Sequence, residues 1–194
     1  SVSCDKSIQL IDVMTGRNQG QLTSHNDVCL DNLWISRYQL ISSSKDRTVK
    51  IFDINRKQCL FTVSTSTAVY SICPTSEPAV FATAGFDGRI RLIDTRQKNI
   101  AKKIDNIQSK IITSIVPSSS RDRFYTLSLD NTICEVSAQT DTVIRKLAVP
   151  SENNKSSAPA NQGEQAKIFV DNQFTKMSID PTGGFLCTGT ECGV

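Results

Sequence analysis

Residues 44–53 read Ser44-Lys45-Asp46-Arg47-Thr48-Val49-Lys50-Ile51-Phe52-Asp53, and this stretch decides the fold. A small residue stands two places before an aspartate, apolar and polar residues then alternate, and the stretch closes on an apolar residue followed by a second aspartate. Alternation with a period of two is the pattern of a β-strand with one buried face. The first aspartate can accept hydrogen bonds from backbone amides of its own turn. The stretch therefore predicts a tight turn at Asp46 followed by a strand.

The same pattern recurs along the chain at a nearly constant spacing. Its anchor aspartates are Asp5, Asp46, Asp87 and Asp130, at spacings of 41, 41 and 43 residues, and a fifth copy follows at Glu191 after a gap of 61. The third position after each anchor is always apolar; it is occupied by Ile8, Val49, Ile90, Ile133 and Val194. Because the agreement extends over several columns, we interpret the chain as a series of repeated units.

Each unit predicts four antiparallel strands and no helix. One strand precedes the anchor turn, one follows it, and a further strand lies at each end. We expect these outer strands at 28–34 and 59–63, at 68–73 and 100–104, and at 111–116 and 143–149. A four-stranded unit cannot bury both of its faces alone, so it must stack on copies of itself. Four strands in a period of roughly 40–45 residues are typical of a β-propeller blade.

The units resemble WD40 repeats, which end in an apolar or aromatic residue followed by aspartate. The resemblance covers the chain except for about residues 150–170. The tryptophan usual in such repeats is replaced by Ile11, Phe52, Ile93 and Val136, and Ser137 replaces the last aspartate. The resemblance implies an all-β fold, a WD40-type β-propeller with four-stranded antiparallel blades.

The spacing also predicts the blade boundaries. We expect the last two strands of a blade in 1–24, complete blades in 25–64, 65–105 and 106–149, a polar inserted loop in 150–169, and the first two strands of a further blade in 170–194. WD40 rings usually have seven or eight blades, so the resemblance implies a partial ring. Two alternatives remain open: the half-blades complete each other in a four-bladed ring, or they pair between two chains.

The resemblance further implies a polar network in one blade. WD40 blades often join a histidine before the first strand to the turn aspartate, to a serine or threonine and to the tryptophan. His25, the one histidine of the chain, fits this place and would pair with Asp46, with Ser44 as a candidate third member. The anchors Asp5, Asp87 and Asp130 recur with the repeat and are therefore interpreted as structural. Their blades lack the histidine, so we expect apolar packing to hold them.

Functional residues are expected where the repeats differ. The anchor turns present Lys45, Arg47, Phe86, Arg89, Leu129 and Asn131 on one face. Because aromatic residues and arginine dominate binding hot spots, this face is predicted to bind partner proteins. The alternative for Phe86 is packing on a neighbouring loop. The polar segment 151–165 is predicted to be a mobile loop on the same face, either a tolerated insertion or a partner-binding or phosphorylated loop.

A further pattern lies in Leu92-Ile93-Asp94-Thr95-Arg96. It resembles the apolar-Asp-x-Arg ending of WD40 receptors that dock on the adaptor of cullin-4 ubiquitin ligases, although Ile93 stands where those motifs prefer tryptophan or tyrosine. Asp94 and Arg96 are therefore candidate adaptor-docking residues. A basic face could also contact nucleic acid, but the net charge of +3 and the lack of interleaved aromatic residues argue against it.

The chain contains no recognisable catalytic or cofactor motif. One histidine and the absence of CxxC, of phosphate-binding loops and of a nucleophile elbow predict no enzyme activity, no cofactor and no metal site. Glu135 is the unusual acid, because its column otherwise holds Leu10, Ile51 and Leu92; we expect it to mark a register shift or an exposed strand edge.

The cysteines and the hydropathy bear on location. Seven cysteines, mostly within apolar runs, are interpreted as reduced thiols of an intracellular protein, cytoplasmic or nuclear. No apolar run approaches the length of a membrane span. The hypothesis from sequence is a non-catalytic protein–protein interaction scaffold that works as a subunit of a complex.

Overall fold

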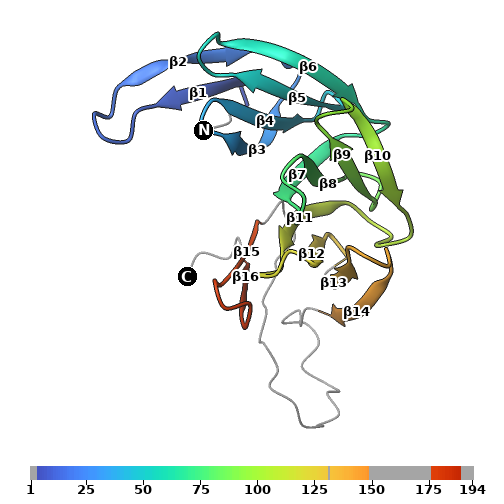
Figure 1. Cartoon of the computed structure of the whole chain (residues 1–194). Coiled ribbons are helices and arrows are strands. Elements are labelled where there is room, and N and C mark those ends of the chain that lie inside the picture. Colours follow the sequence, from blue (N-terminus) through green and yellow to red (C-terminus); the bar gives the residue numbers. More distant parts are fainter. Residues whose placement is uncertain (1–3, 131, 149–175, 189–194) are drawn as a thin grey trace.

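Five antiparallel β-sheets follow one another along an arc (Figure 1). The computed structural model describes residues 4–130, 132–148 and 176–188, and every regular element in these ranges is a strand. Three sheets have four strands and two have two, which confirms the expected partial ring of three complete blades and two half-blades. The predicted polar loop at 150–169 lies outside the described residues.

Each four-stranded sheet is a meander in which consecutive strands pair. The N-terminal strand pair is β1 (Ser7–Ile11) and β2 (Asn18–Thr23). The first blade contains β3 (Cys29–Ser36), β4 (Gln39–Ser44), β5 (Thr48–Asp53) and β6 (Gln58–Ser64). The second blade contains β7 (Val69–Pro74), β8 (Val80–Gly85), β9 (Ile90–Asp94) and β10 (Asn99–Ile104). The third blade contains β11 (Ile112–Pro117), β12 (Arg123–Ser128), β13 (Thr132–Ser137) and β14 (Val143–Ala148), and the C-terminal strand pair is β15 (Met177–Ile179) and β16 (Leu186–Thr188).

The repeats share their backbone conformation as well as their pattern. The residue after the anchor aspartate adopts the left-handed conformation in three copies, at Lys6, Arg47 and Gly88, with φ of 70°, 65° and 68°. A register shift recurs at the start of the first strand of each blade, for example between Cys29 and Asp31. The period seen in the sequence is therefore a period of the backbone.

The apolar core lies between adjacent sheets. Ile41 and Ile51 of the first blade are buried with Phe81 and Ile93 of the second. A second cluster of buried residues joins the second and third blades; it includes Ala84, Ile90, Ile112, Ile115, Phe124 and Val136. Since each middle sheet is covered on both faces, the stacking expected for single four-stranded units is what stabilises them.

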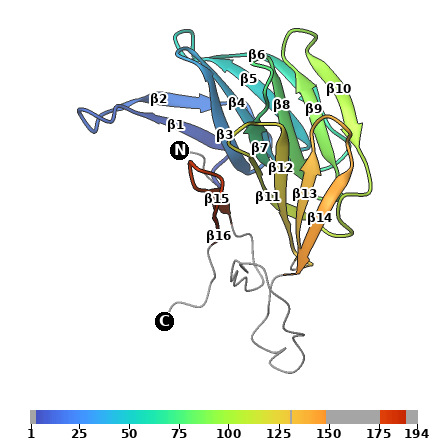
Figure 2. The ribbon, with the colours of Figure 1, turned by 60° about the horizontal axis from the view of Figure 1, so that its bottom comes forward.

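Polar side chains join the first strands of successive blades. Asp31 on β3 accepts hydrogen bonds from Ser71 Oγ (2.8 Å) and from the amide of Ile72 (3.0 Å) on β7. Lys176 donates to the same Asp31 oxygen over 3.0 Å, and the amide of Met177 donates to Ser114 Oγ on β11. These bonds fix the first strands β3, β7, β11 and β15 relative to one another; Figure 2 shows the course of these strands.

The six described cysteines, at positions 4, 29, 59, 73, 134 and 187, are free thiols. Burial raises the pKa of the Cys29 thiol to about 11, so it stays protonated and packs as a small apolar residue. Within the described ranges, no helix is long and apolar enough to cross a membrane.

Gly88 and Gly16 differ in how closely other parts of the backbone approach them. Gly88 and Gly16 have nearly the same left-handed φ, 68° and 67°. A Cβ on Gly88 would lie 2.1 Å from the carbonyl oxygen of Gln108, whereas a Cβ on Gly16 would meet nothing within 4 Å. We expect Gly16→Ala to lower the free energy of unfolding by about 1 kcal/mol, the cost of the left-handed conformation alone. Gly88→Ala should cost clearly more in urea denaturation; equal losses would contradict the close approach.

Candidate partner-binding surface

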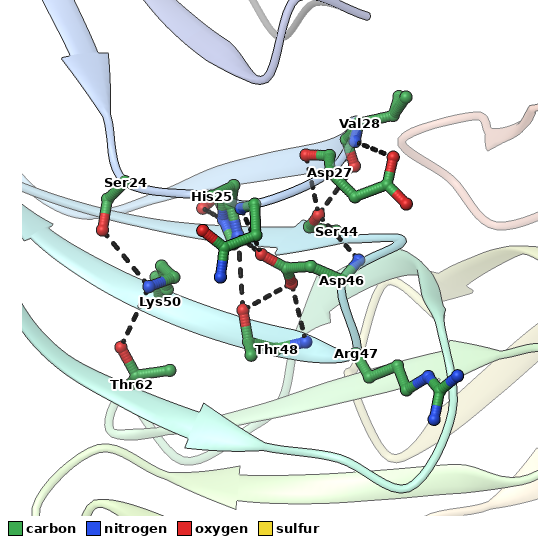
Figure 3. Close-up of polar contacts among 12 residues, drawn as sticks. Ser24, His25, Asp27, Val28, Ser44, Asp46, Arg47, Thr48, Lys50 and Thr62 are labelled. Atoms are coloured by element: carbon green, nitrogen blue, oxygen red, sulfur yellow. Dashed lines mark hydrogen bonds and ion pairs between the residues drawn. The ribbon is translucent and has the colours of Figure 1, made fainter.

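A buried network holds the anchor turn of the first blade (Figure 3). His25 Nδ1 lies 2.9 Å from Asp46 Oδ2, and His25 Nε2 lies 2.7 Å from Ser42 Oγ. The amide of Asn26 donates to the same Asp46 oxygen over 2.9 Å, and Thr48 Oγ1 donates to Asp46 Oδ1 over 2.6 Å. The loop before β3 is thereby tied to the turn between β4 and β5. The structure brings His25 and Asp46 together, as the resemblance implied.

The third member of this network is Ser42 rather than Ser44. Both side chains lie on the same face of β4, because they are two residues apart on a strand. Ser42 is further from the β4–β5 turn, and its hydroxyl contacts the imidazole of His25. Ser44 is next to the turn, where its Oγ donates to the carbonyl of Val28 (2.8 Å) and accepts a hydrogen bond from the amide of Asp46. Ser44, the candidate third member, therefore bonds the amide of Asp46, while Ser42 bonds the imidazole. Ser44 instead closes the start of the turn.

The second blade replaces the histidine with an arginine. Arg91, four residues after the anchor, is fully buried and donates through both terminal nitrogens to Asp87 and through Nη2 to Ser66 Oγ (2.8 Å). Burial alone would raise the pKa of Asp87, but the hydrogen bonds and charge of Arg91 lower it below its ordinary value. The expectation that apolar packing holds this blade was therefore incomplete. In this blade the buried ion pair between Arg91 and Asp87 takes the place of the contact between His25 and Asp46.

The third blade uses an amide and a hydroxyl. Buried Gln108 donates to the carbonyl of Thr132 over 2.8 Å and to its Oγ1 over 2.9 Å. Thr132 in turn donates from its amide to Asp130 over 3.0 Å, and Ser109 Oγ lies 3.2 Å from the same carboxylate. The N-terminal pair has the simplest arrangement, in which the amide and hydroxyl of Ser7 donate to Asp5. In all four repeats the anchor carboxylate thus accepts hydrogen bonds from nearby residues of its own blade.

Glu135 is also part of the fold. Its side chain is 3% exposed and lies between two arginines, with Arg123 Nη1 at 2.7 Å and Arg145 Nε at 3.0 Å. A register shift does occur between Glu135 and Val136 in the pairing of β13 with β14, but comparable shifts occur in the other blades. The expectation of an exposed edge was wrong, because two cations from the neighbouring strands pair with the carboxylate.

The predicted binding residues differ in their exposure. Lys45, Arg47 and Arg89 are exposed, and Phe86 leaves 54% of its surface to solvent, while Leu129 is half-buried. Asn131 lies outside the described residues. Arg89 Nε is 3.3 Å from Asp105 Oδ1, so its charge is partly neutralised. Lys45 and Arg47 form no ion pair with any described residue. Of the predicted binding residues that the structure describes, Phe86 thus exposes an aromatic side chain, and Lys45 and Arg47 are cations without an ion-pair partner.

The side chains of Asp94 and Arg96 form hydrogen bonds with each other. Asp94 is buried and accepts hydrogen bonds from the guanidinium of Arg96 (3.2 Å) and from the amides of Arg96 and Gln97. These bonds lower the pKa of Asp94. Arg96 itself is exposed and also lies 3.6 Å from Glu77. The corresponding Asp12 and Asp53 bind turn amides in the same way, which gives this position a local role in closing the hairpin.

Sequence reasoning missed several residues of these networks. Ser42 and Thr48 carry only the weak signal of a hydroxyl at alternate strand positions. Arg91 had a clearer signal, since the fourth position after the anchor is basic in both Lys50 and Arg91. In the part of the chain that the structure describes, no group of three or more His, Cys, Asp or Glu side chains could hold a metal ion.

Comparison with known proteins agrees with the geometry. The family described as WD domain, G-beta repeat matches residues 16–53 and 57–94. Among solved structures, the WD40 beta propeller domain of Doa1 superposes with a TM-score of 0.75 at 16% identity, covering 94% of this chain and 54% of that chain. At this identity the likeness concerns the fold alone.

Relatives are found by sequence as well. The chain is 30% identical over 122 residues to Autophagy-related protein 16 of Arabidopsis thaliana, covering 62% of this chain and 24% of that protein. It is 23% identical over 190 residues to Protein tipD of Dictyostelium discoideum, covering 97% and 28%. It is 33% identical over 93 residues to WD repeat-containing protein 44 of Xenopus laevis, covering 46% and 10%. The chain thus spans between a tenth and just over a quarter of these curated relatives.

The histidine network predicts a pH dependence of stability. Burial lowers the pKa of His25 below its ordinary value of 6.5, although the neighbouring Asp46 opposes this. The unfolded chain therefore binds the proton more tightly, so stability should be full above pH 6.5 and fall as the pH drops through that value. Because His25 is the one histidine, urea unfolding between pH 7.5 and 5.5 reports on it directly.

The matched variant is His25→Gln, which removes the titrating group. We expect a flat pH profile in this interval and a loss at pH 7.5 of about 1–3 kcal/mol, since Asp46 and Ser42 lose a buried partner. A wild-type stability that rises on acidification from pH 7.5 to 5.5 would contradict the network as described.

Proposed function

We propose that this chain, whose residues 16–53 and 57–94 match the WD40 repeat family, is a non-catalytic scaffold that assembles a multiprotein complex. The proposal places partner binding on the face formed by the anchor turns. It includes an intracellular location, in the cytoplasm or the nucleus, where the free thiols described above are stable.

One observation carries the choice of face. Phe86 follows the end of β8 in the turn to β9, and the residue is 54% exposed although its amide donates a hydrogen bond to the carbonyl of Ala68 (3.0 Å). An exposed aromatic side chain on a fixed backbone loses little conformational entropy on binding. Lys45 and Arg47 occupy the corresponding turn of the first blade and have no carboxylate partner among the described residues. A partner with an apolar pocket and acidic surroundings would match this face.

A second, narrower candidate is a role in autophagy. It is favoured by the 30% identity to Autophagy-related protein 16 over 122 residues of this chain. The propeller of this chain would then supply the interaction surface of such an assembly. In this candidate function the protein is still a scaffold, and the complex that it assembles takes part in autophagy.

The cullin-4 and nucleic-acid alternatives have less support. The carboxylate of Asp94 is already used by Arg96 and by two turn amides, so a local role explains the Asp-x-Arg pattern without an adaptor. Three exposed cations of the anchor turns, Lys6, Lys45 and Arg47, have no ion-pair partner among the described residues, and three are few for phosphate binding, which usually involves a stripe of such residues.

The test is quantitative affinity purification with wild type, Phe86→Ala and Phe185→Ala. Phe185, 72% exposed, belongs to the turn between β15 and β16 and is the matched exposed control. We expect Phe86→Ala to lower the recovery of specific partners by about tenfold, the loss typical of a hot-spot aromatic residue, and Phe185→Ala to leave it unchanged. Equal recovery with all three proteins would refute the proposed face.

The identity of the recovered proteins separates the candidates. Enrichment of autophagy proteins would support the narrower role. Recovery of the cullin-4 adaptor with wild type and its loss with Arg96→Ala would instead favour the ligase receptor.

A further inference from the structure

The exposed charges on the anchor-turn face of the three complete blades are mostly positive. This face consists of the anchor turns and of the linkers 65–68 and 105–111 between blades. Among its described residues, the exposed charged ones are the cations Lys45, Arg47, Arg89 and Lys110 and the acid Asp105. Arg89 Nε lies 3.3 Å from Asp105, so these two charges offset each other. Lys45, Arg47 and Lys110 form no ion pair with any described residue.

The other carboxylates of this face are turned into the blades. They belong to Asp27, Asp46, Asp87 and Asp130, which are half-buried, and each accepts a hydrogen bond within its own blade. The carboxylate of Asp46, for example, is 6% exposed and contacts His25 and Thr48. A ligand that approaches from solvent therefore meets mainly ammonium and guanidinium groups. Such a face favours a ligand that carries carboxylates.

Arg47 lies on one side of the exposed Phe86. The carbonyl of Arg47 accepts hydrogen bonds from the amide and the hydroxyl of Thr65, each over 2.8 Å, at the start of the linker 65–68. At the end of this linker, the carbonyl of Ala68 accepts a hydrogen bond from the amide of Phe86. Because Thr65 and Ala68 are three residues apart, the backbones of Arg47 and Phe86 are separated by on the order of 10 Å. The side chain of Arg47 points away from the network around Asp46 (Figure 3).

Lys110 lies on the other side of Phe86. A Cβ on Gly88, two residues after Phe86, would be 2.9 Å from the carbonyl oxygen of Lys110, and the amide of Gln108 donates to the carbonyl of Gly88 over 3.2 Å. The linker 105–111 is therefore packed against the turn that carries Phe86, again at a separation on the order of 10 Å. Arg47, Phe86 and Lys110 thus follow one another in this order along the arc of blades (Figure 1).

We propose that an extended acidic segment of a partner protein binds along this line. An apolar side chain of the segment packs on Phe86, and carboxylates before and after it bind Arg47 and Lys110. In an extended chain, side chains two residues apart share a face and lie about 7 Å apart, so carboxylates at every second position point to the same surface as the apolar residue. This inference rests on the proposed function, because it names the kind of partner that the anchor-turn face binds.

The test uses fluorescein-labelled peptides and fluorescence anisotropy with the whole chain. The probe is DSDSLSDSD, whose four carboxylates and leucine share one face when the peptide is extended. We expect it to bind saturably, and we expect KSKSLSKSK and DSDSGSDSD to bind at least about tenfold more weakly, since they lack the carboxylates or the apolar side chain. The peptide SDSDLDSDS has the composition of the probe but places its carboxylates opposite the leucine, so it should bind about threefold more weakly or worse.

Variants of the protein give the second arm. Phe86→Ala should weaken the binding of DSDSLSDSD about tenfold. The double variant Arg47→Glu, Lys110→Glu should weaken it by at least as much and should strengthen the binding of KSKSLSKSK. The matched control is Lys103→Glu, Lys146→Glu, which makes the same change of charge at exposed residues of the outer strands β10 and β14 and should leave both affinities unchanged.

Four results would overturn the inference. They are the absence of saturable binding of DSDSLSDSD, equal affinity for the acidic and the lysine peptide, equal affinity for the leucine and the glycine peptide, and an equal loss of binding in the control double variant. If DSDSLSDSD does not bind while Phe86→Ala still lowers the recovery of partners in the affinity purification, the proposed function stands and only the acidic segment is refuted. Unchanged recovery with Phe86→Ala would instead refute the proposed function.

Discussion

In three of the four repeats, the amide two residues after the anchor aspartate donates a hydrogen bond to the anchor carboxylate, and the shape of the repeat depends on this bond. It joins Asp5 to Ser7, Asp46 to Thr48 and Asp130 to Thr132, over 2.9–3.0 Å in each case. The bond sets the turn between the second and third strands, and the left-handed residue within the turn reverses the chain there. Because this turn starts each hairpin in the same register, the apolar residues of successive sheets face one another and a continuous core forms.

The second blade holds its anchor aspartate through a different donor. The position two residues after Asp87 is Arg89 and carries no hydroxyl, whereas Ser7, Thr48 and Thr132 all donate a hydroxyl to their anchor. There the buried guanidinium of Arg91 binds the carboxylate instead. A buried carboxylate needs donors, but their chemical type is free to vary. This explains why the repeats keep their aspartates while the histidine occurs once.

The sequence was sufficient to predict the fold because its signals are local. Alternation, the anchor spacing and the turn chemistry are each read over a few residues, and the strands lie close to where these signals place them. The pairing of His25 with Asp46 came from resemblance. The choice between Ser42 and Ser44 could not be predicted, since both share a face of β4 and the imidazole's depth decides between them. The burial of Glu135 could not be predicted from the sequence either, because Arg123 and Arg145 come close to its carboxylate only when their strands pair with β13.

The end of each blade that carries the anchors is constrained by a carboxylate and its donors, so change there is confined to outward-facing positions such as Lys45 and Phe86. The opposite end is held in a similar way, because Asp12, Asp53 and Asp94 accept hydrogen bonds from turn amides there, beside backbone bonds such as the one from the amide of Ile54 to the carbonyl of Tyr38. Variation is therefore confined to outward-facing side chains at both ends, and specific recognition can arise at either end without disturbing the core.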